Sequence, residues 1–197
     1  MNYNKSISKY IRTAKLFHYK SSIFPFTTNN HEIKQLIPSN YGNNLFSNTN
    51  NNDNISHLIM YDTYNGDTSE WISLMESIMN DNKIKEITLV TDLLMDNPSQ
   101  FISGNDSNNL LRFIEKVTNK LKTFNIQTNI CHPNQLNSKE SKKAVLLLQI
   151  AGANIIGNTP ILNNINNDGD ILNELWMQQR NMNIISNDVY VNQNISK

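Results

Sequence analysis

Apolar residues along the middle and end of the chain fall in short blocks with two alternating spacings. Runs of strand length occur at 57–61, 86–91, 126–130 and 153–157. Apolar residues at helical spacing occupy about 68–80, 110–121, 138–151 and 171–180. Because strands that alternate with helices of this length form crossover units, the pattern predicts an α/β (or α+β) fold. We expect a three- to four-stranded sheet with strand–helix–strand crossovers and helices packed on it, and no internal repeat is evident.

The helix predicted over 138–151 is unusually apolar. It contains Ala144, Leu146, Leu147, Leu148 and Ile150. A surface helix normally carries its apolar residues on one stripe, so we expect this helix to be buried on more than one side.

Asparagine-rich stretches separate the predicted body from the ends of the chain. There are 36 Asn among 197 residues, and the hydrophobic fraction is 38%, below the usual value of about 45–50%. Asn competes for backbone hydrogen bonds and favours turns. We therefore interpret 27–56 as an Asn-rich loop or insertion, 57–182 as a single α/β domain and 183–197 as a polar tail. An A+T-rich genome would explain the bias, and a functional polar tract is the alternative.

Residues 1–26 form a basic segment with an apolar helical stripe. Five cations precede the first acidic residue, Glu32, and Ile7, Ile11 and Phe17 lie on the stripe. This combination is typical of a mitochondrial transit peptide. An ordinary first helix packed on the body fits the same residues. Both interpretations stay open, and with them a cytoplasmic or a mitochondrial location.

Charge and cysteine content limit the classes of partner. The net charge is zero, and the chain beyond residue 31 has 12 basic and 17 acidic side chains. Nucleic-acid-binding proteins usually show a basic excess, so we expect a small molecule or another protein as the partner rather than nucleic acid or an anionic membrane. Cys131 is the sole cysteine, which leaves no internal disulfide and no thiolate cluster for zinc.

The hydropathy pattern predicts a soluble intracellular protein. No apolar run reaches the roughly 18 residues that a transmembrane helix needs. The first 20 residues also lack the continuous apolar stretch of a secretory signal.

Candidate chemistry lies at the predicted carboxyl ends of the strands. Asp62 follows the run at 57–61, Asp92 follows the run at 86–91, and Cys131-His132 follows the run at 126–130. In open α/β sheets this edge binds ligands, and two carboxylates with a His could share acid–base work. Neighbouring residues in an extended chain point to opposite faces, so direct pairing of Cys131 with His132 is not expected.

A plainer interpretation covers the same candidate residues. Capping aspartates at strand ends and a half-buried core Cys are common, and no spacing typical of metal ligands is present, so no metal site is predicted.

A series of short motifs follows one another from about residue 7 to residue 181. They are Phe24-Pro25-Phe26, Thr88-Leu89-Val90, Phe101 to Asp106, Cys131-His132-Pro133, Leu146-Leu147-Leu148 and Arg180-Asn181. Their order resembles a small bacterial and protist family of unknown function. Its members carry a helix leading into Cys-Pro-Phe, a Thr-rich strand, Phe-Leu-x-x-Asn-Asp, a strand ending in Phe-His-Pro, a Leu-rich helix and a late Arg-Asn.

Two positions depart from that family pattern. Phe24 stands where the family has its first Cys, and Cys131 replaces the Phe of Phe-His-Pro. The resemblance implies an α/β architecture and no particular activity. If the family's chemistry uses the first Cys, this chain is a divergent or inactive copy.

Two functions therefore stay open. One is a small-molecule-binding protein or enzyme with a site at the strand C-terminal ends near Asp62, Asp92 and His132, with Cys131 as a further candidate. The alternative is a non-catalytic interaction or assembly protein, in one version part of a mitochondrial complex. The second rests on the lack of a strong catalytic motif, the absent family Cys and the basic front segment. No cofactor or reaction is predicted.

Overall fold

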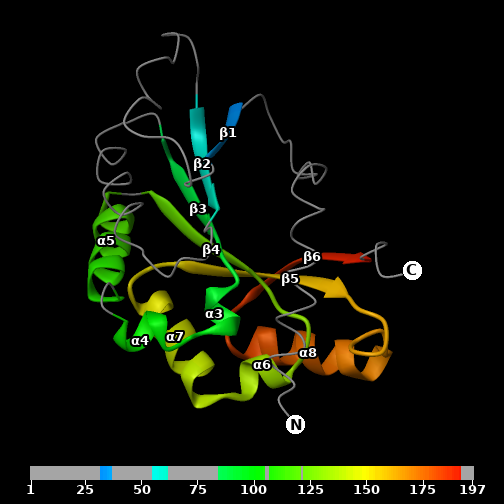
Figure 1. Cartoon of the computed structure of the whole chain (residues 1–197). Coiled ribbons are helices and arrows are strands. Elements are labelled where there is room, and N and C mark those ends of the chain that lie inside the picture. The colour runs from blue at the N-terminus through cyan, green and yellow to red at the C-terminus, as the bar shows by residue number, and fades with distance from the viewer. Residues whose placement is uncertain (1–31, 37–54, 62–83, 105–106, 121, 192–197) are drawn as a thin grey trace.

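Six parallel strands form a sheet in which each strand pairs with the next strand along the chain (Figure 1). The computed structural model describes residues 32–36, 55–61, 84–104, 107–120 and 122–191. The strands are β1 (Glu32–Leu36), β2 (Ile55–Tyr61), β3 (Glu86–Val90), β4 (Thr123–Asn129), β5 (Asn154–Ile161) and β6 (Ile185–Val191). All neighbouring pairs are parallel, so each needs a crossover rather than a hairpin turn.

The described helices lie on one face of this sheet (Figure 1). The crossovers contain α3 (Leu93–Asp96), α4 (Gln100–Ser103) and α5 (Ser107–Asn119), then α6 (Asn134–Asn137) and α7 (Lys139–Ile150), then α8 (Gly169–Asn181). Crossovers between parallel strands have a fixed hand. When the strands also follow one another in sequence order, a fixed hand puts every connection on the same side.

A hydrophobic core fills the space between the sheet and these helices. Phe124 of β4 meets Phe113 of α5 edge to face, with ring centroids 6.0 Å apart. Ile126, Leu148 and Leu175 bring β4, α7 and α8 into the same buried cluster. Edge-to-face aromatic pairs add about 0.5–1.5 kcal/mol to the burial of the rings.

Side-chain caps fix where α7 and α8 begin. Ser138 Oγ accepts a hydrogen bond from the Ser141 backbone N–H over 2.9 Å. An Asp168 carboxylate oxygen accepts one from the Asp170 N–H over 2.8 Å. Each cap satisfies an N–H group that has no partner inside the helix, which typically contributes about 1 kcal/mol.

The predicted α/β class, with its crossovers and packed helices, is confirmed. The four predicted strands correspond to β2, β3, β4 and β5, and the helices predicted near 110–121, 138–151 and 171–180 are α5, α7 and α8. The helix expected at 68–80 and the basic segment 1–26 lie outside the described residues.

The sheet also extends beyond the three to four strands that we expected. β1 falls within 27–56, which we interpreted as a loop or insertion, and β6 falls within 183–197, which we interpreted as a tail. Residues 32–36 and 185–191 are therefore corrected to strands. β6 was missed because Ser186, Asn187 and Asp188 interrupt its apolar residues.

α7 is buried on one side, and the expectation of burial on several sides is corrected. Ala144, Val145 and Leu148 are buried, whereas Leu146 and Ile150 are 56% and 70% exposed. Residues 144, 145 and 148 share one face of a helix, and residues 146 and 150 lie off it. The number of apolar residues in α7 therefore led us to expect more burial than this helix has.

An Asn-Ile-x-x-Asn motif recurs every 29 residues, at 125–129, 154–158 and 183–187. Each copy lies on or at the start of a strand, β4, β5 and β6 in turn. A repeat of one strand and one helix with this period is typical of solenoid architectures. The expectation of no internal repeat is therefore corrected. The repeated residue, Asn, is the commonest in the chain, so the motif is hard to distinguish from the other asparagines.

Gly157 of β5 lies directly against α8. A Cβ at this position would lie 2.9 Å from Gln179 Oε1 and 2.9 Å from Ile130 Cδ1, and Gln179 is buried. We expect Gly157→Ala to lower the free energy of unfolding by about 1–3 kcal/mol, because the methyl group overpacks this contact. Urea unfolding followed by circular dichroism measures the change.

Gly169→Ala, at the start of α8, is the matched control. A Cβ there meets no atom within 4 Å. The control should keep or slightly raise the stability, because Ala favours helix over Gly by about 1 kcal/mol. Equal losses in both variants would contradict close packing of α8 on β5.

Candidate functional site

Two rows of polar side chains cross the sheet on the face opposite the described helices. Phe124 and Ile126 point into the core, so Asn125 between them points to the other face, as do Gln127 and Asn129. In register, Asn125 lies beside Asn154 of β5. The repeated asparagines of the 29-residue motif therefore become neighbours across the strands.

The first row links β2 to β5 through one chain of hydrogen bonds. Asn125 Nδ2 donates to Glu86 Oε1 over 2.6 Å and to Thr88 Oγ1 over 3.2 Å. Asn154 Nδ2 donates to Asn125 Oδ1 over 3.0 Å. The Thr88 hydroxyl also lies 2.9 Å from His57 Nε2. Because Asn125 and Thr88 are buried, these bonds offset the cost of removing their polar atoms from water.

The second row crosses from the carboxyl ends of β3 and β4 to the middle of β5 and to β6. Asp92 Oδ1 accepts hydrogen bonds from the backbone N–H and from Nδ2 of Asn129, over 3.2 Å and 3.1 Å. The Tyr190 hydroxyl donates to Asn129 Oδ1 over 3.2 Å. Asn187 Nδ2 donates to Asn158 Oδ1 over 3.1 Å. This row joins the ends of β3, β4, β5 and β6.

Solvent reaches these rows at β5 and β6, and also at His57 and Glu86, which are partly exposed. Asn125 and Gln127 of β4 are buried. Asn154 is exposed, and Asn158 and Asn187 are half-buried. We call the part of the face formed by Asn154, Asn158 and Asn187 the amide face. It offers side-chain amides, each with two N–H donors and one acceptor oxygen.

The described site candidates, Asp92, Cys131 and His132, lie just beyond the ends of β3 and β4. Asp92 is buried and its Oδ1 is bonded to Asn129. His132 is half-buried, and its Nδ1 accepts from the backbone N–H of Asn134 over 3.2 Å. Asp62 lies outside the described residues.

Cys131 belongs to the core. It is completely buried and packs with Leu162. Burial raises the pKa of its thiol far above the ordinary value, and the charges of Asp92 and Asp96 raise it further. The thiolate is the nucleophilic form of Cys, so this thiol has the properties of a packing residue.

The strand order also bears on where a small-molecule pocket could form. Ligands of open α/β sheets bind in the crevice where the strand order reverses and neighbouring loops leave toward opposite faces. In the described sheet the order runs from β1 to β6 without reversal. The edge that carries Asp92 and His132 therefore has no crevice of this kind.

The described parts of the chain contain neither a cluster of metal-ligating side chains nor a membrane-spanning helix. Among these residues, no group of three or more His, Cys, Asp or Glu side chains could hold a metal ion. No described helix combines the length and the hydropathy needed to cross a lipid bilayer.

Protein-family models and curated proteins were compared with this sequence. No family model matches the chain, and no curated protein matches it. The resemblance to the small family of unknown function stays a prediction from short motifs.

Sequence reasoning missed the amide rows because it assigned asparagines to loops. The signal that would have found them is the recurrence of Asn125, Asn154 and Asn183 at one spacing, each followed by Ile. An Asn that alternates with buried Ile indicates a strand with one polar face.

The first amide row should make stability depend on pH through His57. Burial lowers the pKa of His57 below its ordinary value of 6.5, and the negative charge of Glu86 partly opposes the shift. The Glu86 Oε1 atom lies 3.8 Å from His57 Nε2. In the unfolded chain His57 takes up a proton as the pH falls through about 6.5, while the folded state resists it.

We therefore expect the free energy of unfolding to fall as the pH drops from about 7.5 to about 5.5, and His57→Gln to make that fall smaller. Carboxylates titrate mostly below this window. Urea unfolding across the window measures both proteins. An unchanged pH dependence in the variant would show that His57 is not held in its neutral form.

Proposed function

We propose that this chain is a non-catalytic interaction protein that binds a polypeptide partner through its amide face. The observation that carries the proposal is the two-sided character of the sheet. One face packs against the described helices, and the other bears the amide rows that become accessible at β5 and β6. Strand–helix solenoids commonly use such a surface for binding.

Amides suit the recognition of a polypeptide. Asn154, Asn158 and Asn187 each make one side-chain bond to a neighbour, which does not use all the donors and acceptors of an amide. A partner's backbone N–H and C=O groups can bond to those that remain. Because amides are neutral, such binding avoids the large cost of desolvating a charge.

The chemistry at the strand ends favours this proposal over the small-molecule alternative. An enzyme of the predicted kind would use Asp62, Asp92 and His132, with Cys131 as a possible nucleophile. The buried thiol, the bonds that occupy Asp92 and the unreversed strand order all weaken that alternative. It stays a sequence-based prediction.

The compartment of the proposed interaction follows from the fate of residues 1–26. If they are a transit peptide, protein recovered from cells lacks them and the partner is mitochondrial. If they are a first helix, the recovered protein keeps them. The intact mass of the recovered protein separates these two alternatives.

Site-specific photo-crosslinking tests the proposed face. A benzophenone amino acid replaces Asn154 on the amide face or, as a matched control, Asn108 on α5, and both positions are exposed. After irradiation in the source cells, we expect a discrete protein adduct from position 154 that is absent from position 108. The reason is that a bound partner would lie within reach of β5 and not of α5.

Other results would contradict the proposal or favour the small-molecule alternative. No adduct from position 154, or the same adducts from both positions, would contradict the proposal. A metabolite that raises the melting temperature of the wild-type protein, but not of His132→Ala and Asp92→Asn, would favour the small-molecule alternative.

A further inference from the structure

Exposed large apolar side chains gather at one end of the sheet. Of the seven in the described residues, two lie on α7 and five lie on α8 and β6: Trp176, Met177, Ile185, Val189 and Val191. We call these five residues the α8–β6 edge. Three of the five, Trp176, Ile185 and Val189, line one groove. Exposed apolar side chains that gather in this way mark an interaction surface, whereas single ones are ordinary.

β6 ends the described sheet. It pairs with β5 on one side, and no described strand pairs with its other side. Parallel strands are normally covered, and an apolar edge that is left open invites association. Among the described strands, the α8–β6 edge is such an edge and carries exposed apolar residues.

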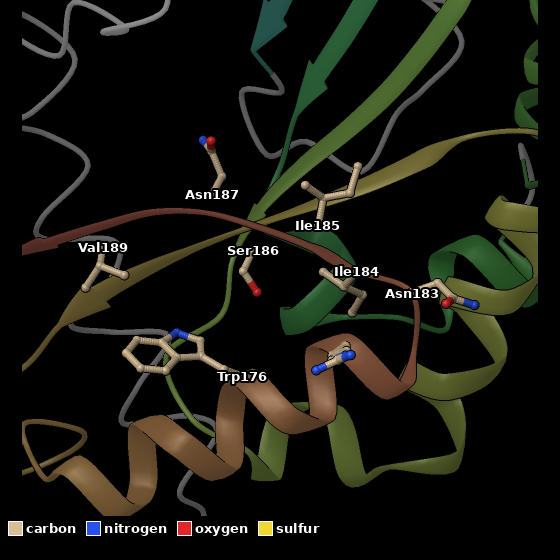
Figure 2. A pocket seen from close by; sticks show the side chains of 8 residues that line it. Trp176, Asn183, Ile184, Ile185, Ser186, Asn187 and Val189 are labelled. Atoms are coloured by element: carbon tan, nitrogen blue, oxygen red, sulfur yellow. The ribbon is translucent and has the colours of Figure 1, made fainter.

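A groove of about 720 Å³ runs between α8 and β6 at this edge. In Figure 2 the Trp176 ring reaches from α8 toward β6, and Ile184 and Ser186 point toward α8. Ile185 and Asn187 point to the opposite side of the strand. The groove therefore has an aromatic wall on one side and an edge strand on the other.

A bulge shapes the β6 side of the groove. Gly157 pairs with Ser186, but Thr159 pairs with Val189, so β6 has one extra residue there. The extra residue returns Val189 to the same face as Ser186, toward Trp176. A bulge also interrupts pairing with an added strand. The groove is therefore better suited to side-chain packing than to the addition of a long strand.

Two opposite charges flank the apolar residues. Arg180 lines the groove, and Asp188 is the sole charged side chain of β6. Neither forms an ion pair with another described residue. Arg180 thus supplies a cation at the groove, and Asp188 supplies an anion on β6 between two residues that line it, Asn187 and Val189. Opposite charges on neighbouring elements allow two copies of this edge to complement each other.

We infer that a second copy of this chain covers the α8–β6 edge about a two-fold axis. In a two-fold interface, residue i of one copy meets residue j of the other and the reverse holds as well. Arg180 of each copy then faces Asp188 of its partner, while Trp176 packs on the apolar residues of the opposite edge. Trp and Arg are the residue types that most often dominate interface energies. This inference does not depend on the proposed function, although Asn187 of the amide face also lines the groove.

Sedimentation velocity of the full chain, from nanomolar to high micromolar concentration, tests the inference. We expect a reversible change from 22.6 kDa to twice that mass. Trp176→Glu and Val189→Lys should each weaken the association by about tenfold or more, because each puts a charge into an apolar contact. Ile150→Lys, an exposed apolar position on α7, is the control and should leave it unchanged.

Charge reversal tests the two-fold geometry. Arg180→Asp and Asp188→Arg should each weaken the dimer, because like charges then face each other, and the double variant should restore it. Circular dichroism verifies that each variant is folded. The inference would be overturned if the wild-type chain stayed at 22.6 kDa or formed species larger than a dimer. It would also be overturned if neither apolar variant weakened the association, or if the double variant did not restore it.

Discussion

The order of the strands is the constraint on which the rest of this structure depends. Each strand lies beside the next one in sequence and all run parallel, so crossovers of one hand must all leave toward the same face. The helices gather there and form the core with Phe124, Ile126 and Ile155. The opposite face receives the alternate residues of the same strands. The two faces of this sheet therefore need different side chains, apolar toward the helices and polar on the opposite face.

Side-chain amides meet that need on the second face. A row of like charges would be destabilised by repulsion between neighbouring side chains. An apolar row would leave a large exposed hydrophobic surface, because no described helix covers this face. Asn in register with Asn satisfies donors and acceptors within the row, as Asn125 does with Asn154 and Asn158 with Asn187. Each bond contributes only about 0.5–1.5 kcal/mol net. The rows also supply the neutral hydrogen-bonding surface on which the proposed interaction depends.

Periodicity predicted the parts of the fold where burial is strong. The strands β2 to β5 and the helices α5, α7 and α8 follow from apolar spacing, because core positions leave a regular signal. β1 was missed because it is only five residues long, and β6 was missed because Ser186, Asn187 and Asp188 interrupt its apolar residues.

Other features could not follow from spacing alone. The exposure of Leu146 and Ile150 depends on what packs against α7, which no local pattern specifies. The roles of Asn125 and Asp92 depend on which strands are neighbours, and the strand order is a property of the whole sheet. The 29-residue recurrence of Asn-Ile-x-x-Asn does indicate which strands are neighbours. It is hard to recognise because the chain contains 36 Asn, most of them outside the motif.

A double-mutant cycle between Asn125 and Asn154 tests most directly whether the amide rows hold neighbouring strands together. The free energy of unfolding in urea would be measured for the wild type, for Asn125→Ala, for Asn154→Ala and for the double variant. The account predicts a coupling energy of about 0.5–1.5 kcal/mol, because either substitution removes the same hydrogen bond between β4 and β5. Strictly additive losses would mean that the two amides do not interact, and would contradict the amide rows as the basis of the second face.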